Sequence, residues 1–253
     1  KREDLQPVFS FKLRGAYNKM AHLAPDRRAG GVICASAGNH GQGVAYAARA
    51  LGAHAVIVMP QTTPEIKVQA VRGMGAEVVQ VGDDYTAAQR HAEALCAERG
   101  LEFVHPFDDP MLIAGHGTVG LEIVEGADAP FDAVVVGVGG GGLISGVVTA
   151  FEALSPQTRV FGVEPEGAAT MTSALDAGAV VRLEDLHTLA DGLAPPSVGA
   201  LHPAIAVRAL VRVVPVAASH SRAPMPLPLQ PPPRHVPPPR APAPPPLPRP
   251  PIP

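Results

Sequence analysis

Between residues 29 and 165, short runs of apolar and mostly β-branched residues alternate with longer stretches of helical character. Such runs are typical of strands buried on both faces, and the helices between them are typical of parallel βαβ units. Strands are predicted at 31–35, 55–59, 77–81, 102–104, 132–138 and 159–163, and helices at 42–51, 64–73, 84–98, 113–125 and 143–154. The sequence therefore predicts an α/β fold with parallel sheets, although it does not give the order of the strands.

The chain changes character near residue 194. Of its 30 prolines, 17 lie within 224–253, and all 23 acidic residues lie at or before Asp191. The first 192 residues carry 14 basic residues and a net charge of −9, whereas the remainder carries +6. An acidic body argues against a nucleic-acid-binding protein and favours small molecules as partners.

We expect an aberrant segment at 195–218, in which 201–218 could form one apolar strand or one helix. Residues 219–253 are predicted to be a Pro-rich, disordered tail with polyproline II character, because this composition cannot build a packed core. The abrupt loss of Asp, Glu and Lys is what translation of a GC-rich gene in a shifted frame would produce. As an alternative function, the P-x-x-P repeats of the tail resemble ligands of SH3- or WW-like domains, which would make the chain an interaction protein built on an inactive enzyme.

The two cysteines, Cys34 and Cys96, have no metal-ligand spacing around them. This argues against a disulfide scaffold and a cysteine-rich metal site, and it favours a reducing cytoplasm. No apolar run reaches the roughly 18 residues that a membrane span needs, so no membrane partner is expected. The chain begins at Lys1 directly inside a motif and is predicted to be a fragment.

The run VVVGVGGGGL at 134–143 leads from a predicted strand through four consecutive glycines into a predicted helix. Several backbone N–H groups and the positive end of a helix can then face one point, which predicts a phosphate site. A tight turn without a ligand needs only one glycine, and four are costly in chain entropy. Gly137, Gly139 and Gly142 also satisfy G-x-G-x-x-G, with Glu164 after the next strand, so an NAD-dependent oxidoreductase is an alternative at this point.

A second glycine-containing loop, ASAGNHGQG at 35–43, also lies between a predicted strand and a helix. It places a hydroxyl (Ser36), an amide (Asn39) and an imidazole (His40) near a helix start, which suits a bound carboxylate. The alternative is a plain loop in which His40 is a cap or a surface residue.

Lys12 is one of only four lysines and lies between two apolar residues in SFKLRGA at 10–16. An amine in apolar surroundings loses its charge more easily and becomes nucleophilic. The spacing by itself favours an ordinary surface lysine on an amphipathic helix.

Four segments closely resemble the threonine dehydratases, which are pyridoxal-phosphate enzymes of the tryptophan synthase β-like type (fold type II). They are KREDLQPVFSFKLRGA at 1–16, ASAGNHGQGVA at 35–45, HPFDDPMLIAGHGT at 105–118 and VGVGGGGL at 136–143, and the likeness runs to about residue 194. The resemblance implies a two-domain, three-layer αβα fold, with a partial catalytic domain at 1–194 and a small subdomain at roughly 28–120 inserted in a large one. It also implies that the four glycines hold the phosphate of pyridoxal 5'-phosphate and not a dinucleotide.

The resemblance implies a role for each matching residue. Lys12 would form the Schiff base with the cofactor and act as the catalytic base, with Phe11 packed near the cofactor ring. Asn39 would bind the phenolic oxygen of the cofactor, and Glu164 would lie near its pyridine ring. The phosphate would be bound by Gly139, Gly140, Gly141, Gly142 and Leu143, and the substrate carboxylate by Ser36, Ala37, Gly38, Asn39 and His40.

The implied activity is deamination of L-threonine to 2-oxobutanoate and ammonia, the first step of isoleucine biosynthesis, with L-serine giving pyruvate in the same geometry. Serine racemases of this fold carry a serine just before G-N-H-G as a second acid/base, whereas this chain has Ala37, which favours dehydration. The expected partners are an amino-acid substrate and, for an intact chain, further copies in a homo-oligomer. The family's Ser or Cys that contacts the pyridine nitrogen has no match here, and His116 stands where the family usually has Gln.

Overall fold

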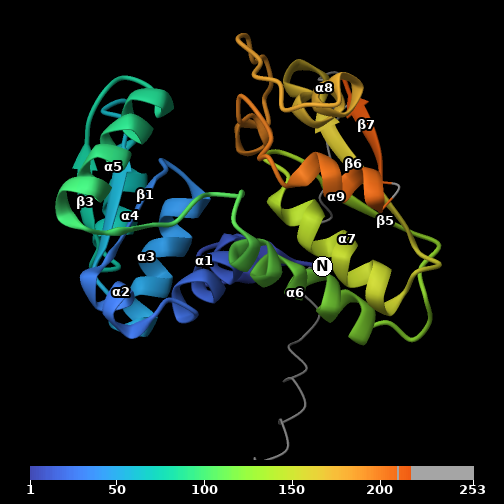
Figure 1. Cartoon of the computed structure of the whole chain (residues 1–253), viewed down its shortest axis with the longest axis horizontal. Helices are drawn as coiled ribbons and strands as arrows, with labels where there is room; N and C mark the ends of the chain where they lie inside the picture. The colour runs from blue at the N-terminus through green and yellow to red at the C-terminus, as the bar shows by residue number, and fades with distance from the viewer. Residues whose placement is uncertain (210, 218–253) are drawn as a thin grey trace, which may run out of the picture. The chain divides into compact units, whose positions relative to one another are not determined.

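The computed structural model describes residues 1–209 and 211–217, and the structural statements below refer to these ranges (Figure 1). Helices and strands alternate along the chain as the apolar runs predict. The strands are β1 (Val32–Ala35), β2 (Ala55–Met59), β3 (Glu77–Gln80), β4 (Glu102–Phe103), β5 (Ala133–Gly137), β6 (Arg159–Pro165) and β7 (Arg212–Val216). The α-helices are α1 (Lys12–Ala21), α2 (Pro25–Gly30), α3 (Asn39–Leu51), α4 (Glu65–Arg72), α5 (Tyr85–Arg99), α6 (Pro110–Glu125), α7 (Gly142–Leu154), α8 (Thr170–Ala177) and α9 (His202–Arg208). Three short 3-10 helices are η1 (Glu3–Leu5), η2 (Glu166–Ala168) and η3 (Asp191–Leu193).

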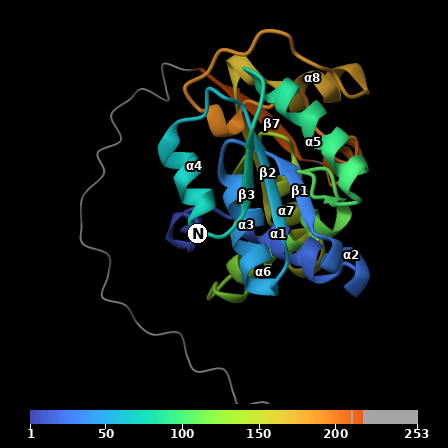
Figure 2. The same ribbon diagram turned by 90° about the vertical axis from the view of Figure 1, so that its left-hand side faces the viewer.

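The first sheet has the strand order β3-β2-β1-β4, and all its strands are parallel. Val32 and Cys34 of β1 belong to a core shared with α1, α3 and α4, whereas Ile33 and Ala35 belong to a core shared with α5. Both faces are therefore buried, which explains why β1 and β2 are apolar at every position. Figure 2 shows β1, β2 and β3 between α4 and α5, the three-layer arrangement that the resemblance implies.

The second sheet has the order β5-β6-β7 and is also parallel. One face carries Val136 and Val160, which form a core with residues of α7, α8 and α9. On the other face of β5, Val135 is 67% exposed. Within the described ranges, layers of helices therefore cover both faces of the first sheet but leave part of the second open.

Helix α6 lies between α1 and α7 and packs against both (Figure 1). At the α1 crossing, a Cβ on Gly115 would lie 2.5 Å from the carbonyl oxygen of Arg14. At the α7 crossing, a Cβ on Gly146 would lie 2.5 Å from the amide nitrogen of Gly117. Because no side chain fits there, the three backbones approach directly. This places the helix that begins with Lys12 and the helix that follows the glycine loop on one rigid support.

Residues 1–209 and 211–217 belong to one compact unit. All strands of the first sheet lie inside the subdomain predicted at roughly 28–120, but the boundaries of that subdomain stay a prediction. Across the described ranges, every helix is too short or too polar to cross a membrane.

The segment that begins at residue 195 has a defined structure up to residue 217. Instead of one strand or one helix over 201–218, the chain forms α9 and then β7, and β7 pairs in parallel with β6. Val198, His202 and Ala206 are buried. The aberrant segment at 195–218 stays a prediction, but in its described part apolar residues still decide burial after the acidic residues stop. The Pro-rich tail predicted at 219–253 lies outside the described residues.

Candidate active site

Lys12 is the first residue of α1, and its side chain is half-buried. Its Nζ donates a hydrogen bond to the carbonyl oxygen of Pro106, at 2.6 Å. Burial lowers the pKa of Lys12 from 10.5 to about 8. A fraction of the amine is therefore neutral near physiological pH, and a neutral amine is both a nucleophile and a base. This environment differs from that of the ordinary surface lysine that the spacing alone favours.

The segment from Pro106 to Asp108 connects Lys12 to the glycine loop. Pro106 receives the hydrogen bond of Lys12, and the next residue, Phe107, packs against the loop. A Cβ on Gly140 would lie 2.3 Å from the Phe107 ring, and a Cβ on Gly142 would lie 3.0 Å from the Phe107 carbonyl oxygen. The structure thus brings together two motifs that lie more than a hundred residues apart in the sequence.

The glycine loop lies between β5 and α7. Gly141 immediately precedes α7 and has a φ of 98°, a left-handed conformation that favours glycine. In the part of the chain that the structure describes, no side chain caps this helix start, so its first N–H groups can bind an anion. Close packing on Phe107 and on His202 is a second reason, besides phosphate binding, for the absence of side chains at Gly140–Gly142.

The other predicted residues of this loop can offer only backbone groups to a ligand. Gly139 approaches Leu193 so closely that a Cβ would lie 3.2 Å from the Leu193 Cα. Leu143 lies in the first turn of α7. Its side chain packs in the core between the second sheet and α7, so only its N–H can reach a ligand. The arrangement agrees with a site that binds through N–H groups, as the sequence predicts.

The loop between β1 and α3 carries the predicted substrate-binding residues. The Ser36 hydroxyl accepts a hydrogen bond from the Gly38 N–H at 3.1 Å, which shapes the turn. A Cβ on Gly38 would meet no atom within 4 Å, so this part of the loop faces open space, and Asn39 is exposed. Farther along α3, a Cβ on Gly43 would lie 3.0 Å from the backbone of Lys12. The start of α3 is therefore in contact with the start of α1.

His40 is turned into the protein and not toward the open side of the loop. It is 3% exposed, and its Nε2 lies 2.9 Å from the carbonyl oxygen of Val104. Burial, which has the largest effect, lowers the pKa of His40 to about 3. Its side chain thus ties the loop to the end of β4, so a contact of His40 with a substrate would have to come from its backbone.

Glu164 is also buried, at 1% exposure. One carboxylate oxygen accepts from the Met171 N–H at 3.0 Å, and the other accepts from the N–H of Thr172 at 2.8 Å and from its hydroxyl. These groups lie in the first turn of α8, so the carboxylate acts as a cap for that helix. Its predicted contact with a cofactor ring stays a prediction, and the cap is an explanation that the sequence did not reveal.

His116 lies next to Phe11, the neighbour of Lys12, although its sequence motif predicts no role for it. It is fully buried, its ring meets Phe11 edge-on with centroids 4.8 Å apart, and a Cβ on Gly15 would lie 2.4 Å from its Nε2. Among the described residues neither ring nitrogen has a hydrogen-bond partner, and burial holds its pKa well below the usual range. The motifs at 105–118 identified this stretch, but they did not indicate where Pro106, Phe107 or His116 would point.

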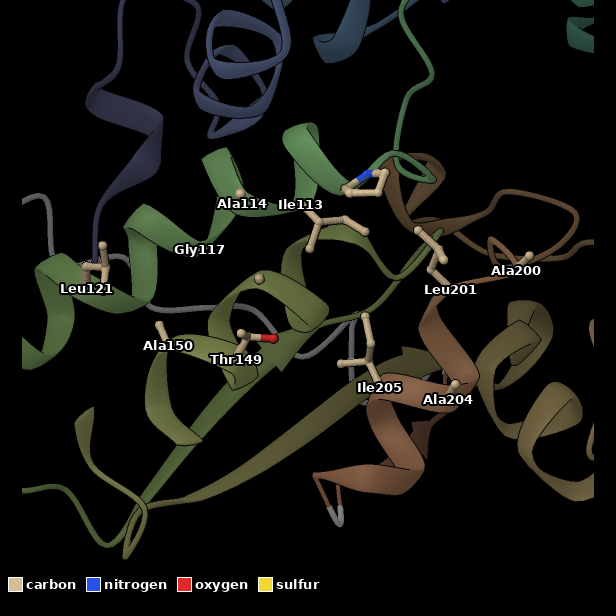
Figure 3. A pocket seen from close by; sticks show the side chains of 12 residues that line it. Ile113, Ala114, Gly117, Leu121, Thr149, Ala150, Ala200, Leu201, Ala204 and Ile205 are labelled. Atoms are coloured by element: carbon tan, nitrogen blue, oxygen red, sulfur yellow. The ribbon is translucent and has the colours of Figure 1, made fainter. Parts of the chain in front are cut away.

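A cavity of about 620 Å³ lies between α6, α7 and α9 and contains none of the predicted site residues (Figure 3). Its lining is almost entirely apolar, with Ile113, Leu121, Leu201 and Ile205 pointing into it and Thr149 as the polar exception. A phosphate needs several N–H donors or positive charges, which this cavity does not offer. The candidate site is therefore the one built around Lys12.

The residues around Lys12 fit pyridoxal phosphate. A neutral amine such as that of Lys12 can capture an aldehyde. Uncapped N–H groups, such as those at the start of α7, can bind a phosphate. Both are present, and Phe107 joins them. Gly139 to Leu143 would hold the phosphate and Lys12 would hold the aldehyde.

Comparison with known proteins agrees with this fit. Residues 1–225 match the family described as "Pyridoxal-phosphate dependent enzyme", so the family likeness extends beyond residue 194. The chain is 56% identical over 199 residues to "Threonine dehydratase biosynthetic, chloroplastic" of Arabidopsis thaliana. The aligned region covers 79% of this chain and 34% of that protein.

Two solved structures are also similar. The processed form of threonine deaminase isoform 2 from Solanum lycopersicum has a TM-score of 0.80 and 48% identity, over 85% of this chain and 63% of that one. Maize serine racemase has a TM-score of 0.82 and 34% identity, over 87% of this chain and 66% of that one. The dinucleotide alternative finds no support in these matches, and the chain belongs to the family of pyridoxal-phosphate dependent enzymes.

Proposed function

We propose that the chain is a threonine ammonia-lyase, which converts L-threonine to 2-oxobutanoate and ammonia and accepts L-serine, giving pyruvate. The proposal rests on the names of its relatives and on one observation: the half-buried amine of Lys12 contacts the segment that packs on the glycine loop. The chain spans 34% of the length of its Arabidopsis relative and 50% of that of an L-threonine ammonia-lyase from Thermotoga maritima. The activity of the whole enzyme is therefore a proposal for this chain.

Each part of the site has a task in this reaction. Lys12, whose pKa is lowered to about 8, takes the proton from the substrate Cα as a neutral base. The loop at 36–40 holds the substrate carboxylate through N–H groups at the start of α3. Pyridoxal phosphate, when bound, delocalises the negative charge left at Cα. Asn39 and Phe11 keep the roles that the family resemblance gives them, at the cofactor's phenolic oxygen and beside its ring. The proton that Lys12 takes up can pass to the β-hydroxyl, which then leaves as water, and hydrolysis afterwards releases ammonia.

Ala37 favours elimination over racemisation. A racemase has to return a proton to the opposite face of Cα, which requires a second acid, and an alanine side chain has no proton to give. We therefore expect D-serine formation to be negligible compared with pyruvate formation from L-serine. The Ala37→Ser variant tests this point, because it adds a hydroxyl in the loop without changing its backbone.

The test uses the full chain with pyridoxal phosphate and L-threonine, and it measures 2-oxobutanoate. Borohydride reduction followed by peptide mass spectrometry should locate the cofactor on Lys12. Lys12→Ala and Lys12→Arg should lose both the covalent attachment and turnover, whereas Lys67→Ala, on α4, should retain both. Attachment at another lysine, or turnover by Lys12→Ala, would contradict the assignment.

We also propose a reducing compartment, such as the cytoplasm, and a homo-oligomer. The free thiols of Cys34 and Cys96 support the first, since Cys34 is buried and neither forms a disulfide with another described residue. The second comes only from the family resemblance and stays a prediction.

A further inference from the structure

His202 connects α9 to the glycine loop from a fully buried position. It is the first residue of α9 and is 0% exposed. Its Nδ1 lies 2.8 Å from the Ser145 hydroxyl, and Ser145 is itself 2% exposed in the first turn of α7. A buried hydrogen bond of this kind is costly to leave unmade, so it fixes the start of α7 relative to α9.

The His202 ring also lies directly against the loop. A Cβ on Gly141 would come within 2.6 Å of the ring Cγ, and the Phe107 ring lies on the same side, with centroids 6.2 Å apart. Gly141 is the residue whose left-handed conformation ends the loop and starts α7. The imidazole therefore restricts the movement of the Gly141 backbone by direct contact.

The turn at 199–201, which precedes His202, contacts both the glycine loop and the segment that follows Pro106. The Gly199 N–H donates to the Gly140 carbonyl oxygen at 3.1 Å. The Asp108 carboxylate accepts from the N–H groups of Ala200 at 2.9 Å and Leu201 at 3.2 Å. Since Asp108 follows Pro106 and Phe107, one turn holds the glycine loop and the segment that receives the Lys12 hydrogen bond.

The surroundings also define the tautomer of His202. Its Nε2 lies 3.8 Å from an Asp108 carboxylate oxygen and has no hydrogen-bond partner among the described residues. The nearby negative charge favours the proton on Nε2, so Nδ1 is the acceptor and the Ser145 hydroxyl donates to it. Burial, the main effect, lowers the pKa of His202 to about 4, which agrees with a neutral ring.

We propose that His202 is a positioning residue that holds the N–H groups of the glycine loop in the geometry needed to bind the cofactor phosphate. The inference rests on the proposed function only in taking pyridoxal phosphate as the ligand. His202 is fully buried and lies against Gly141, so we assign it an effect on the loop backbone and no part in proton transfer. It belongs to a segment whose composition had set it apart from the catalytic domain.

The test measures cofactor binding directly, by titrating the full chain with pyridoxal phosphate and following protein fluorescence and the phosphorus NMR signal of the bound phosphate. His202→Ala should weaken binding by about tenfold or more, the size of one buried hydrogen bond, and should shift or broaden the phosphorus signal. His202→Asn keeps an acceptor near the Nδ1 position and should recover most of the affinity. Ser145→Ala removes the other partner with little change of volume and should move the phosphorus signal in the same direction.

Arg208→Ala is the matched control, because Arg208 also ties α9 to α7, through Glu152 at 2.8 Å, but far from the loop. It should lower the melting temperature without changing affinity or the phosphorus signal. Wild-type affinity and an unchanged signal in both His202→Ala and Ser145→Ala would overturn the proposal, and if His202→Ala fails to fold, Ser145→Ala and His202→Asn decide. A chain that binds the cofactor but does not convert threonine refutes the proposed function alone, whereas a wild-type chain that binds no cofactor refutes both.

Discussion

Two of the four lysines of this chain, Lys12 and Lys19, have different electrostatic surroundings. Lys19 lies 2.9 Å from an Asp109 oxygen and 3.4 Å from a Glu102 oxygen, and these carboxylates raise its pKa although burial acts in the opposite direction. Among the described residues, Lys12 donates only to the neutral carbonyl of Pro106, and burial lowers its pKa to about 8. The same helix thus holds one lysine that gives up its proton easily and one that does not.

This contrast predicts an order of chemical reactivity. Brief acetylation over a range of pH, followed by mass spectrometry, should show Lys12 becoming reactive as the pH rises through about 8, because the neutral amine is the reactive form. Lys19 should need a pH above the usual lysine value of about 10.4. In the unfolded chain, Lys12 and Lys19 should react alike. Equal reactivity in the folded chain would contradict the burial of Lys12.

Glu164 permits a second test at the scale of one residue. Because both of its oxygens bind the first turn of α8, Glu164→Ala should lower the free energy of unfolding by about 2 kcal/mol in urea denaturation. Glu164→Gln keeps one acceptor oxygen, so its free energy of unfolding should lie between those of the wild type and Glu164→Ala. The absorption spectrum of bound cofactor should not change, and a changed spectrum with unchanged stability would instead favour a contact with the pyridine ring.

The residues of the candidate site differ in how far the sequence could predict them. Local motifs identify Lys12 and both loops, because the strand–glycine–helix pattern is contained within a few residues. They do not reveal that His40 bonds to Val104 or that His202 bonds to Ser145. These partners lie 64 and 57 positions away, and only the packing of whole elements brings them together.

At the scale of elements, apolar runs predict positions well and boundaries less well. The strand predicted at 55–59 is β2, with the same ends. Helix α6 begins at Pro110 and not at residue 113, because the Asp109 carboxylate accepts from the N–H groups of Met111 and Leu112 and so caps the helix. The Asp-Pro pair at this point is a start signal that the apolar pattern does not contain.

The crossing of α6 and α7 predicts a large effect from a small substitution. Gly146→Ala places a methyl group 2.5 Å from backbone atoms of Gly117 and Ile113, so the helices must separate. We expect a loss of about 1–3 kcal/mol in unfolding free energy, together with weaker cofactor binding, since α7 carries the glycine loop. Gly30→Ala is the control, because its methyl group would meet only a carbonyl oxygen at 3.6 Å, and it should be neutral in both measurements.

For the whole molecule, the alternation of strands and helices is sufficient to predict a parallel α/β fold. It is not sufficient to predict that β1 lies between β2 and β4, or that the strands form two sheets. Strand order depends on contacts between distant segments, which no local pattern encodes. The change of composition near residue 194 gives no sign of α9 and β7 for the same reason, since these elements are recognised only by the core that they complete.

The apolar cavity between α6, α7 and α9 gives a prediction for the chain in solution. Leu121 and Leu201, which line it, are 38% and 39% exposed, so a fluorescent dye that binds apolar surfaces should bind the folded chain. The double variant Leu121→Lys, Leu201→Lys should reduce dye emission. Ile66→Lys, on α4, changes a single exposed residue outside the cavity and should not. Equal emission from all three proteins would show that the dye binds elsewhere.

The hydrogen bond from Lys12 to Pro106 also determines the direction from which the amine can react. With one N–H directed at that carbonyl, the lone pair of the neutral amine points to another side, so an incoming aldehyde carbon must approach from there. Protonation removes the lone pair of the Lys12 amine. It also strengthens the hydrogen bond to the Pro106 carbonyl oxygen, because a charged donor makes a stronger hydrogen bond. Acid therefore slows capture by lowering the number of free amines, and the bond of the charged amine to the carbonyl makes its proton harder to remove.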